Sequence, residues 1–443
     1  MAQKKILVIC RGREAREIKS ILAQIAIPFD FAFTATDIKR KIRRGDVACA
    51  LFDNDAFSGG LDSKRLDFLK ILRTSGKSFI FLSSSSSFCL AEEAESFGAS
   101  EIVIRPYNYR ELILRINSCY HKKVRITCMG GGTGLFNLLM GLKKLPHVLI
   151  NSIVAMSDDG GSTGKLRESF GMLPPGDVRR SLVALSNAPL LMNEVLQHRF
   201  RKGGEKYQGH NFGNLFLTAL NEITGSMKEG VRCLGDILNI QGIVIPVTDT
   251  NVRLMAMFEH GKIIRGENKI DLAEGRNPKL RIKGLWHEPC AVCNIDAFAS
   301  ILNADVVVIG PGDLFTSVIT NLIVEHIPEA LARTRAKKVY VCNLMTKPGE
   351  TAHYGVFEHV REIINYMRGD YLDYIVVSNS KVSKRLLGLY KAKGQFPVKL
   401  GDLEKIKKIT KAKVIRADIT HQTELVRHDS DKLKNVIQRI IKI

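Results

Sequence analysis

Residues 1–122 alternate short apolar runs with amphipathic stretches. The apolar runs read KILVIC at 5–10, VACALF at 47–52, SFIFL at 78–82 and EIVI at 101–104, with a weaker one at 29–33. Helix-like segments separate them, for example at 13–24 and 109–120. Strands and helices that alternate at this spacing predict a parallel sheet covered by helices on both faces.

A second α/β region follows a short polar link, His121-Lys122-Lys123. We therefore predict two domains, 1–122 and 123–443, the second without internal repeats. Its apolar runs lie at 124–129, 150–156, 305–309 and 338–342, and most of them lead into a glycine-rich or polar loop. Because the carboxyl ends of parallel strands lie at one edge of a sheet, these loops are expected to converge on one crevice.

The first of these loops is Gly130-Gly131-Gly132-Thr133-Gly134, between a strand and a helix with leucines at 135, 138, 139 and 142 on one face. A helix N-terminus behind a glycine turn suits a phosphate, because its N–H groups are free and no Cβ blocks the approach. The alternative is a tight strand–helix connection. The dinucleotide fingerprint fails at Leu135, and a Walker A loop fails because Leu166 follows Gly164-Lys165.

Two further loops carry charge. Asp158 and Asp159 in SDDGGSTG (157–164) suit a divalent cation that bridges phosphates, or sugar hydroxyls; the alternative is a turn that caps the next helix. In LPPGDVR (173–179), Asp177 is expected to N-cap a helix to about Leu185, and Arg179 or Arg180 could face an anion.

Three polar blocks complete the set. GHNFGN (209–214) precedes an apolar helix, and its His210 is either a general acid or a structural histidine. GPGDLFTS (310–317) is a second glycine turn after a strand, and CNLMTKPGET (342–351) is a third polar loop.

Composition narrows the class of protein. The 443 residues carry 66 Lys and Arg against 45 Asp and Glu, a net charge of +21, and about +11 of it falls within residues 381–443. Solvated helix faces explain this excess better than a nucleic-acid footprint, because no aromatic–Arg interleaving accompanies it. No apolar run is long enough to cross a membrane.

Nine scattered cysteines indicate free thiols and a cytoplasmic protein, and the single CxxC at 290–293 lacks partners for zinc.

The first region resembles a response-regulator receiver domain, and hence a flavodoxin-like fold, in its element order and in Asp53, Ser83 and Arg105-Pro106. Cys10 and Arg11 stand where a receiver needs an acidic pair for Mg²⁺, so we expect a degenerate receiver in which Asp53 accepts phosphate poorly. It would serve as a docking or dimerisation module. A working phosphoacceptor and an unrelated domain are the alternatives; no helix-turn-helix pattern supports DNA binding.

The blocks of the second region, in this order, resemble the YvcK-like gluconeogenesis-factor family, within the wider group of CofD 2-phospho-L-lactate transferases. The residues that carry the resemblance are GGGTGL (130–135), DDGGSTG (158–164), LPPGDVR (173–179), GHNFGN (209–214), GPGDLFTS (310–317), CNLMTKPGET (342–351) and LVRHD (425–429). The resemblance covers the chain from Val124 onward and implies a three-layer Rossmann-like fold that binds a nucleotide diphosphate.

For YvcK-like proteins the resemblance implies a UDP-sugar ligand such as UDP-N-acetylglucosamine and a regulatory role in carbon metabolism, cell shape and cell-wall precursor supply. For CofD-like proteins it implies Mg²⁺-dependent transfer of a phospholactyl-type group from a guanylyl donor to a hydroxyl. We favour binding over turnover and leave open whether a reaction is catalysed. The nucleotide sugar, a protein partner of the receiver-like domain and a second copy of the chain are the partners considered.

The resemblance and the loops together define candidate site residues. Asp158 and Asp159 are the expected Mg²⁺ ligands and, with His210, the catalytic candidates. The expected ligand-binding residues are Gly130, Gly131, Gly132, Thr133, Gly134, Ser162, Asp177, Arg179, His210, Asn211, Asn214, Gly310, Gly312, Asp313, Ser317, Asn343, Thr346 and Lys347. The chain departs from the family pattern at Asp313, where Ser is commoner, at Asn211-Phe212, where Ser-Leu is commoner, and in having the receiver-like region.

Overall fold

The computed structural model describes residues 4–57, 62–272, 277 and 280–442, and its packing divides the chain into two units. Unit 1 contains the chain up to Arg125 together with 147–149 and 298–304, and unit 2 contains 126–146, 150–297 and 305–443. Short segments from later in the chain thus pack with the first unit. The domain division expected at 122 and 123 stays a prediction.

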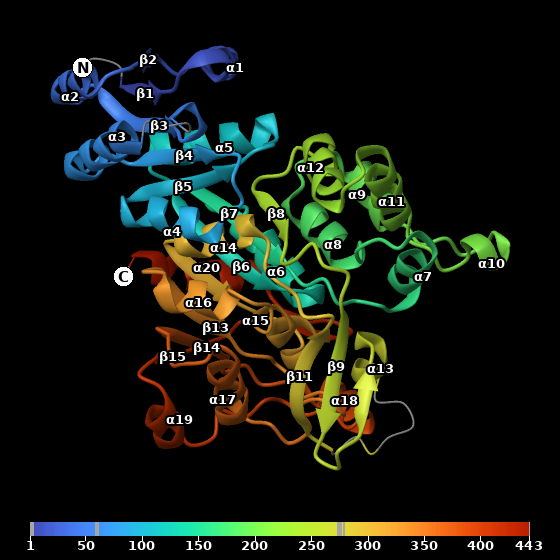
Figure 1. Cartoon of the computed structure of the whole chain (residues 1–443). Coiled ribbons are helices and arrows are strands. Elements are labelled where there is room, and N and C mark those ends of the chain that lie inside the picture. The colour runs from blue at the N-terminus through green and yellow to red at the C-terminus, as the bar shows by residue number, and fades with distance from the viewer. Residues whose placement is uncertain (1–3, 58–61, 273–276, 278–279, 443) are drawn as a thin grey trace. The chain divides into compact units, whose positions relative to one another are not determined.

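Unit 1 is built on one five-stranded sheet, visible in blue in Figure 1. Its strands are β1 (Lys5–Ile9), β2 (Phe29–Phe31), β3 (Val47–Asp53), β4 (Phe79–Ser83) and β5 (Ala99–Ile104). Its helices are α1 (Gly12–Gln24), α2 (Ala35–Arg43), α3 (Asp62–Ser75), α4 (Phe88–Ser96) and α5 (Tyr109–His121), with a 3₁₀ turn at Asp55–Phe57. The order β2-β1-β3-β4-β5, with every pair parallel, is the flavodoxin-like order. The fold expected for this region is confirmed.

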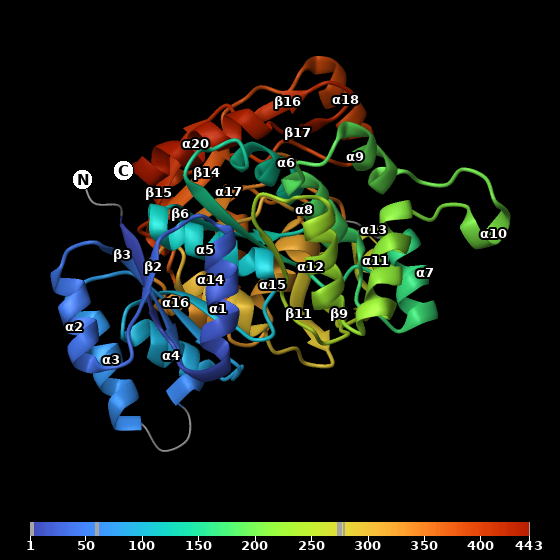
Figure 2. The same ribbon diagram turned by 90° about the horizontal axis from the view of Figure 1, so that it is seen from above.

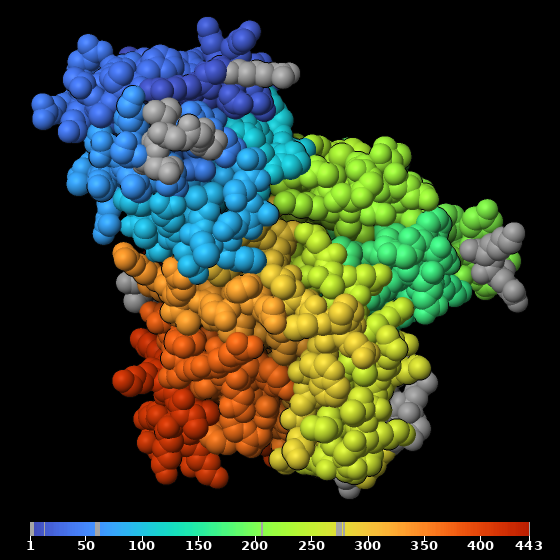
Figure 3. Space-filling view, in the orientation of Figure 1, coloured from blue at the N-terminus to red at the C-terminus, as the bar shows by residue number. Residues whose placement is uncertain are grey.

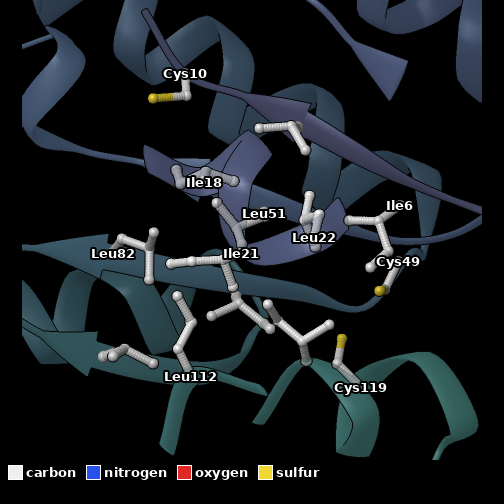
Figure 4. Close-up of a cluster of buried hydrophobic side chains, with 14 residues drawn as sticks. Ile6, Cys10, Ile18, Ile21, Leu22, Cys49, Leu51, Leu82, Leu112 and Cys119 are labelled. Atoms are coloured by element: carbon white, nitrogen blue, oxygen red, sulfur yellow. The ribbon is translucent and has the colours of Figure 1, made fainter. Parts of the chain in front are cut away.

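A buried cluster joins one helix layer of unit 1, made of α1 and α5, to the sheet. Ile6, Leu22, Leu51 and Ile116, from β1, α1, β3 and α5, all belong to this cluster, which is drawn in Figure 4. Strands of a parallel sheet are covered on both faces, and so the apolar runs in the sequence are nearly continuous rather than alternating.

Unit 2 contains the larger sheet, with the order β15-β14-β13-β12-β6-β7-β8, except for the first residues of β6 and β7, which belong to unit 1. The strands are β6 (Val124–Gly130), β7 (Val148–Val154), β8 (Ile243–Pro246), β12 (Val306–Ile309), β13 (Lys337–Val341), β14 (Tyr374–Ser378) and β15 (Lys413–Ala417). Every pair with an assigned register is parallel. Seven strands with connecting helices form the Rossmann-like centre that the sequence predicts.

The helices lie on both faces of this sheet, as Figure 2 shows with α6 (Gly132–Leu142) and α20 (Ser430–Lys442) on one face and α16 (Ile327–Arg333) on the other. The three-layer arrangement is therefore confirmed. The remaining helices are α7 (Gly161–Phe170), α8 (Gly176–Leu185), α9 (Leu190–Gln197), α10 (Gly204–Tyr207), α11 (Phe212–Thr224), α12 (Met227–Ile237), α13 (Glu267–Leu272), α14 (Ile295–Leu302), a π-helix (Leu314–Ile319), α15 (Thr320–Leu322), α17 (Val356–Tyr366), α18 (Lys384–Ala392) and α19 (Leu403–Ile409).

Two small antiparallel sheets accompany the large one. One has the order β10-β9-β11, from β9 (Arg253–Phe258), β10 (Ile263–Arg265) and β11 (Ile282–Glu288), and its side chains make up the yellow surface in Figure 3. The other pairs β16 (Thr420–Gln422) with β17 (Val426–His428). Among the described residues, no helix is both long and apolar enough to span a bilayer.

The chain winds outward from the centre of the large sheet in two directions. β6 and β12 are adjacent, and the chain continues from β6 to β7 and β8 on one side and from β12 to β13, β14 and β15 on the other. In open α/β sheets such a reversal of strand order leaves a crevice at the carboxyl ends of the two central strands. The loops that leave these two strands are the glycine turns at 130–134 and 310–312.

Helices α6 and α20 pack through a glycine. A Cβ on Gly141 would overlap the carbonyl oxygen of Ser430 and lie 3.3 Å from the Cβ of Lys434. The two helices can therefore approach this closely only because position 141 has no side chain.

We predict that Gly141→Ala lowers the free energy of unfolding by about 1–3 kcal/mol, because the methyl group forces α6 and α20 apart. Gly388→Ala is the matched control: Gly388 lies inside α18 with open space around it, so alanine there raises stability by up to about 1 kcal/mol. Chemical denaturation of both variants measures this, and equal effects at the two positions would contradict the packing.

Candidate functional site

A cavity of about 270 Å³ lies at the carboxyl ends of β6, β12 and β13. It is lined by Gly131, Gly132, Thr133, Gly134, Asn137, Gly312, Asp313, Ser317, Asn343, Leu344, Met345, Tyr390, Val426, Arg427 and His428. Three loops that are far apart in the sequence thus meet at one place, beside the β16–β17 hairpin.

The glycine turn places the N-terminus of α6 in this cavity. Gly131 is the N-cap residue, no side chain caps the helix, and Gly132 follows with φ +65°. The first N–H groups of a helix have no partner within the helix. Together with the positive end of the helix dipole, they form a site for an anion.

The second glycine turn packs directly against the first. A Cβ on Gly134 would lie 2.5 Å from the carbonyl oxygen of Pro311, and Asn321 Nδ2 donates to the carbonyl of Gly130 at 3.3 Å. Ser317, one turn further on, is close to Gly132 as well. Glycine is therefore required at position 134 for the two turns to approach each other, apart from any role with a ligand.

The third loop contributes an amide with an open acceptor. Asn343 Nδ2 donates to the carbonyl of Gly312 at 2.7 Å, while its Oδ1 is buried and has no partner among the described residues. A buried acceptor without a hydrogen bond costs about 1–3 kcal/mol, which a ligand N–H at the cavity would recover.

Two residues of the cavity wall were not predicted as site residues. Tyr390, from α18, contributes an aromatic ring, and its hydroxyl accepts from Val426 N at 3.0 Å. Arg427, in β17, is the only Lys or Arg among the described lining residues, and its guanidinium makes no hydrogen bond or ion pair with them. Arg427 belongs to the sequence block LVRHD (425–429). Its place beside the glycine turn depends on the fold of the β16–β17 hairpin, which the block alone does not indicate.

The two neighbouring aspartates of the SDDGGSTG loop point to different partners. Asp158 accepts from Gly160 N at 2.9 Å in an Asx turn, and a Cβ on Gly176 would lie 2.7 Å from its Oδ2. Asp159 instead accepts from Asn268 N at 2.8 Å and faces Arg253 at 3.5 Å. The pair does not form one site, and only Asp158 faces other carboxylates.

Asp177 does not cap its helix, contrary to the expectation. α8 begins at Gly176, so Asp177 lies within the first turn and makes no capping hydrogen bond. Its Oδ1 accepts from Arg180 Nη1 at 3.0 Å, and its Oδ2 lies close against Gly131. This carboxylate therefore adjoins the glycine turn.

Glu267, at the start of α13, belongs to the same acidic group, and its isolated position gave no signal in the sequence. Burial, followed by the charges of Asp158, Asp271 and Asp177, raises its pKa from 4.5 to about 10. Burial and the charge of Asp177 likewise raise the pKa of Asp158, to about 6. Glu267 has no hydrogen bond or ion pair with the described residues. Carboxylate oxygens are the ligands that a hard divalent cation prefers.

The GHNFGN loop forms a hydrogen-bonded unit at the start of α11. Asn211 is the N-cap of α11 and its Oδ1 accepts from Asn214 N at 3.1 Å. Arg179 Nε donates to Asn214 Oδ1 at 2.8 Å, and Ser162 Oγ lies 3.3 Å from His210 Nδ1. None of these residues lines the cavity, and these bonds make them supports of the loop.

Lys347 is held among three carboxylates. Its Nζ donates to Asp271, to Asp313 at 2.7 Å, and lies 3.2 Å from Glu350. Burial raises the pKa of Glu350 to about 8, against the lowering effect of Lys347. The lysine therefore fixes the carboxylate of Asp313 and offsets part of the negative charge of this group, and it lies outside the cavity lining.

The predicted residues thus fall into two sets. The cavity brings together Gly131, Gly132, Thr133, Gly134, Gly312, Asp313, Ser317 and Asn343. Those outside its lining are Gly130, Asp158, Asp159, Ser162, Asp177, Arg179, His210, Asn211, Asn214, Gly310, Thr346 and Lys347. Of the second set, Gly130 and Asp177 adjoin the glycine turns, and Thr346 bonds to the backbone of Phe396.

Unit 1 carries a separate carboxylate centre at Asp53, which is fully buried. Arg105 donates to both of its oxygens, at 3.0 and 2.9 Å, and Cys10 Sγ lies 3.0 Å from Oδ2. Burial raises the pKa of the Cys10 thiol, so it stays protonated and donates. A bidentate guanidinium thus occupies both oxygens of the carboxylate that a receiver would phosphorylate.

The known proteins to which this chain is similar match it mainly from residue 126 onward. The profile of the family described as 2-phospho-L-lactate transferase CofD matches residues 126–420. A putative gluconeogenesis factor of Thermotoga maritima is 39% identical over 324 residues, 72% of this chain and 99% of the relative. The gluconeogenesis factor of Bacillus subtilis is 38% identical over 325 residues, 72% and 99% respectively. A crystal structure of a UPF0052-family protein from Bacillus halodurans has a TM-score of 0.67 and 37% identity, covering 71% of this chain and 99% of its own.

We predict that acetyl phosphate and Mg²⁺ leave Asp53 unmodified, because Arg105 occupies both carboxylate oxygens and no acidic pair follows β1 to hold the metal. Intact-mass analysis of the full chain measures this, with a working receiver protein as the positive control. A mass increase of one phosphoryl group that disappears in Asp53→Asn would contradict it.

We also predict that the stability of the protein without added metal falls as pH rises. The folded-state pKa of Glu267 lies above its unfolded value, so the folded protein retains a proton that the unfolded chain releases between pH 4.5 and about 10. Glu267→Gln removes this proton linkage and should flatten the fall in Tm between about pH 5 and about pH 9. Glu222→Gln, at an exposed position of α11, is the control. An unchanged pH profile in Glu267→Gln would show that this carboxyl is not perturbed.

Proposed function

Because the chain belongs to the gluconeogenesis-factor family and carries a CofD-like domain, we propose that unit 2 binds a nucleotide diphosphate sugar of the UDP-N-acetylglucosamine type. Binding, rather than turnover, is the proposed activity. It would make the protein a regulator that couples the supply of this sugar nucleotide to carbon metabolism, cell shape and cell-wall precursor supply.

The observation that carries the proposal is the uncapped N-terminus of α6 in a cavity of about 270 Å³. A diphosphate there accepts from the N–H groups of Gly132, Thr133 and Gly134. Arg427, whose guanidinium makes no hydrogen bond or ion pair with the described residues, supplies the positive charge that a diphosphate requires.

The same cavity also contains groups that suit a base. Tyr390 offers a ring for stacking, Leu344, Met345 and Val426 offer apolar surface, and Asn343 Oδ1 offers an acceptor for a base N–H. One cavity thus contains the donors for phosphates and the surfaces for a nucleobase.

The carboxylates next to the glycine turn suit Mg²⁺. Asp177 adjoins Gly131, and its negative charge raises the pKa of both Asp158 and Glu267. Carboxylate oxygens together with phosphate oxygens are the usual ligands of Mg²⁺ in nucleotide sites. We assign Asp158 and Asp177 as its protein ligands, in place of the Asp158–Asp159 pair, since Asp159 turns toward Arg253.

Transfer of a phospholactyl-type group is the second candidate, favoured by the same carboxylates, because a metal beside a diphosphate also serves group transfer. His210 is not well placed for proton transfer there: its Nδ1 bonds to Ser162, and it lies outside the cavity lining. Accumulation of GMP from a guanylyl donor, an acceptor hydroxyl compound and Mg²⁺ would favour this candidate over binding alone.

We predict that calorimetry with Mg²⁺ detects UDP-N-acetylglucosamine binding and that Gly132→Asp weakens it about a hundredfold, because a carboxylate beside the diphosphate adds like-charge repulsion. Gly401→Asp is the matched control: Gly401 has φ +68° against +65° at Gly132, and open space around it, so it carries the same backbone strain away from the cavity. Absence of binding, or equal weakening by both substitutions, would overturn the proposal.

A further inference from the structure

A second cavity, of about 540 Å³, lies in unit 2 between α6, the β16–β17 hairpin and the start of α20. None of the predicted site residues lines it, but four residues of the block LVRHD (425–429) do. Its wall includes Met140 from α6, the hairpin turn Thr423–Leu425 and Asp429 before α20.

The second cavity adjoins the first. Asn137, Arg427 and His428 line both. Asn137 Nδ2 donates to the carbonyl of His428 at 3.0 Å, which holds α6 to the hairpin at the junction. Burial lowers the pKa of His428 to about 4, so its imidazole is neutral at physiological pH. Arg427 is therefore the only charged side chain that lines both cavities at that pH.

The two cavities differ in chemistry. The second has three carboxylates, from Glu424, Asp429 and Asp431, against two cations, Lys144 and Arg427. Both oxygens of Asp431 are engaged by Lys144 at 2.9 Å. A diphosphate is repelled by such a wall, whereas sugar hydroxyls donate to carboxylates and accept from amides and hydroxyls.

Several of these polar groups are open to a ligand. The carboxylate of Glu424 and the hydroxyl of Thr423 make no hydrogen bond with the described residues. Met140 and Leu425 add small apolar surfaces beside them, and Leu425 is 43% exposed. No phenyl or phenol ring lines this cavity within the described part of the chain, in contrast to Tyr390 in the first.

We propose that the second cavity is the glycosyl subsite: it receives the hexose of the nucleotide diphosphate sugar while the nucleoside diphosphate occupies the first cavity. The inference rests on the proposed function and adds to it the residues that distinguish a sugar nucleotide from its nucleoside diphosphate. The hairpin turn Thr423–Leu425 then determines specificity for the sugar, and the glycine turns determine affinity for the diphosphate.

The test compares UDP with UDP-N-acetylglucosamine by calorimetry on the full chain. Glu424→Ala removes one acceptor for a sugar hydroxyl, and we expect it to weaken UDP-N-acetylglucosamine about tenfold and leave UDP within about twofold. Leu425→Trp fills the subsite, and we expect it to reduce the affinity for the sugar nucleotide to that for UDP. Glu424 and Leu425 are exposed, so both variants should fold.

Leu191→Trp, at a 69% exposed position of α9, is the control for the bulky substitution and should change neither affinity. If the wild type binds neither compound, the proposed function fails and the subsite with it. If it binds UDP-N-acetylglucosamine but both subsite variants weaken the two ligands equally, or weaken neither, the subsite is wrong and the proposed function stands.

Discussion

The close approach of two glycine turns at the centre of the large sheet determines the rest of unit 2. β6 and β12 are neighbours, and each ends in a turn whose backbone contacts the other turn: Gly134 packs on the Pro311 carbonyl, where any Cβ would overlap it. Since the chain winds away from this point in both directions, the other parallel strands of this sheet add their loops to the same edge. The cavity exists because two backbones, without side chains, meet at the reversal of strand order.

The carboxylates beside this contact are the second constraint on the unit. Asp177 adjoins Gly131, and the pKa of Glu267 is raised to about 10 by burial and by neighbouring carboxylates. Packing negative charge beside a site for an anion disfavours the anion unless a cation joins them. Arg180 pairs with Asp177, whereas Asp158 and Glu267 have no ion pair with the described residues. The same electrostatics that destabilise the protein alone thus favour a ligand bound together with Mg²⁺.

The sequence predicted the elements well because their signals are local. Apolar runs located the strands, leucines 135, 138, 139 and 142 located the buried face of α6, and the glycine turns located the cavity. It failed where a side chain's partner lies far along the chain. Asp159 turns to Arg253, so adjacency to Asp158 gave the wrong pairing, and Asp177 sits within its helix because α8 begins one residue before it. Arg427 and Tyr390 reach the cavity only through the hairpin and α18, which no local pattern indicates.

The two units treat a buried carboxylate in opposite ways, and the difference bears on what each can do. In unit 1, Arg105 satisfies both oxygens of Asp53 and also bonds Asp55 at 2.8 Å, so the charge is neutralised within the protein. The negative charge of a buried carboxylate with such a partner is balanced without a bound metal ion. In unit 2, Glu267 lacks such a partner among the described residues and its neighbours are acidic. The two units therefore differ in how their buried carboxylates are compensated: by an internal guanidinium at Asp53, and by no counter-ion among the described residues at Glu267.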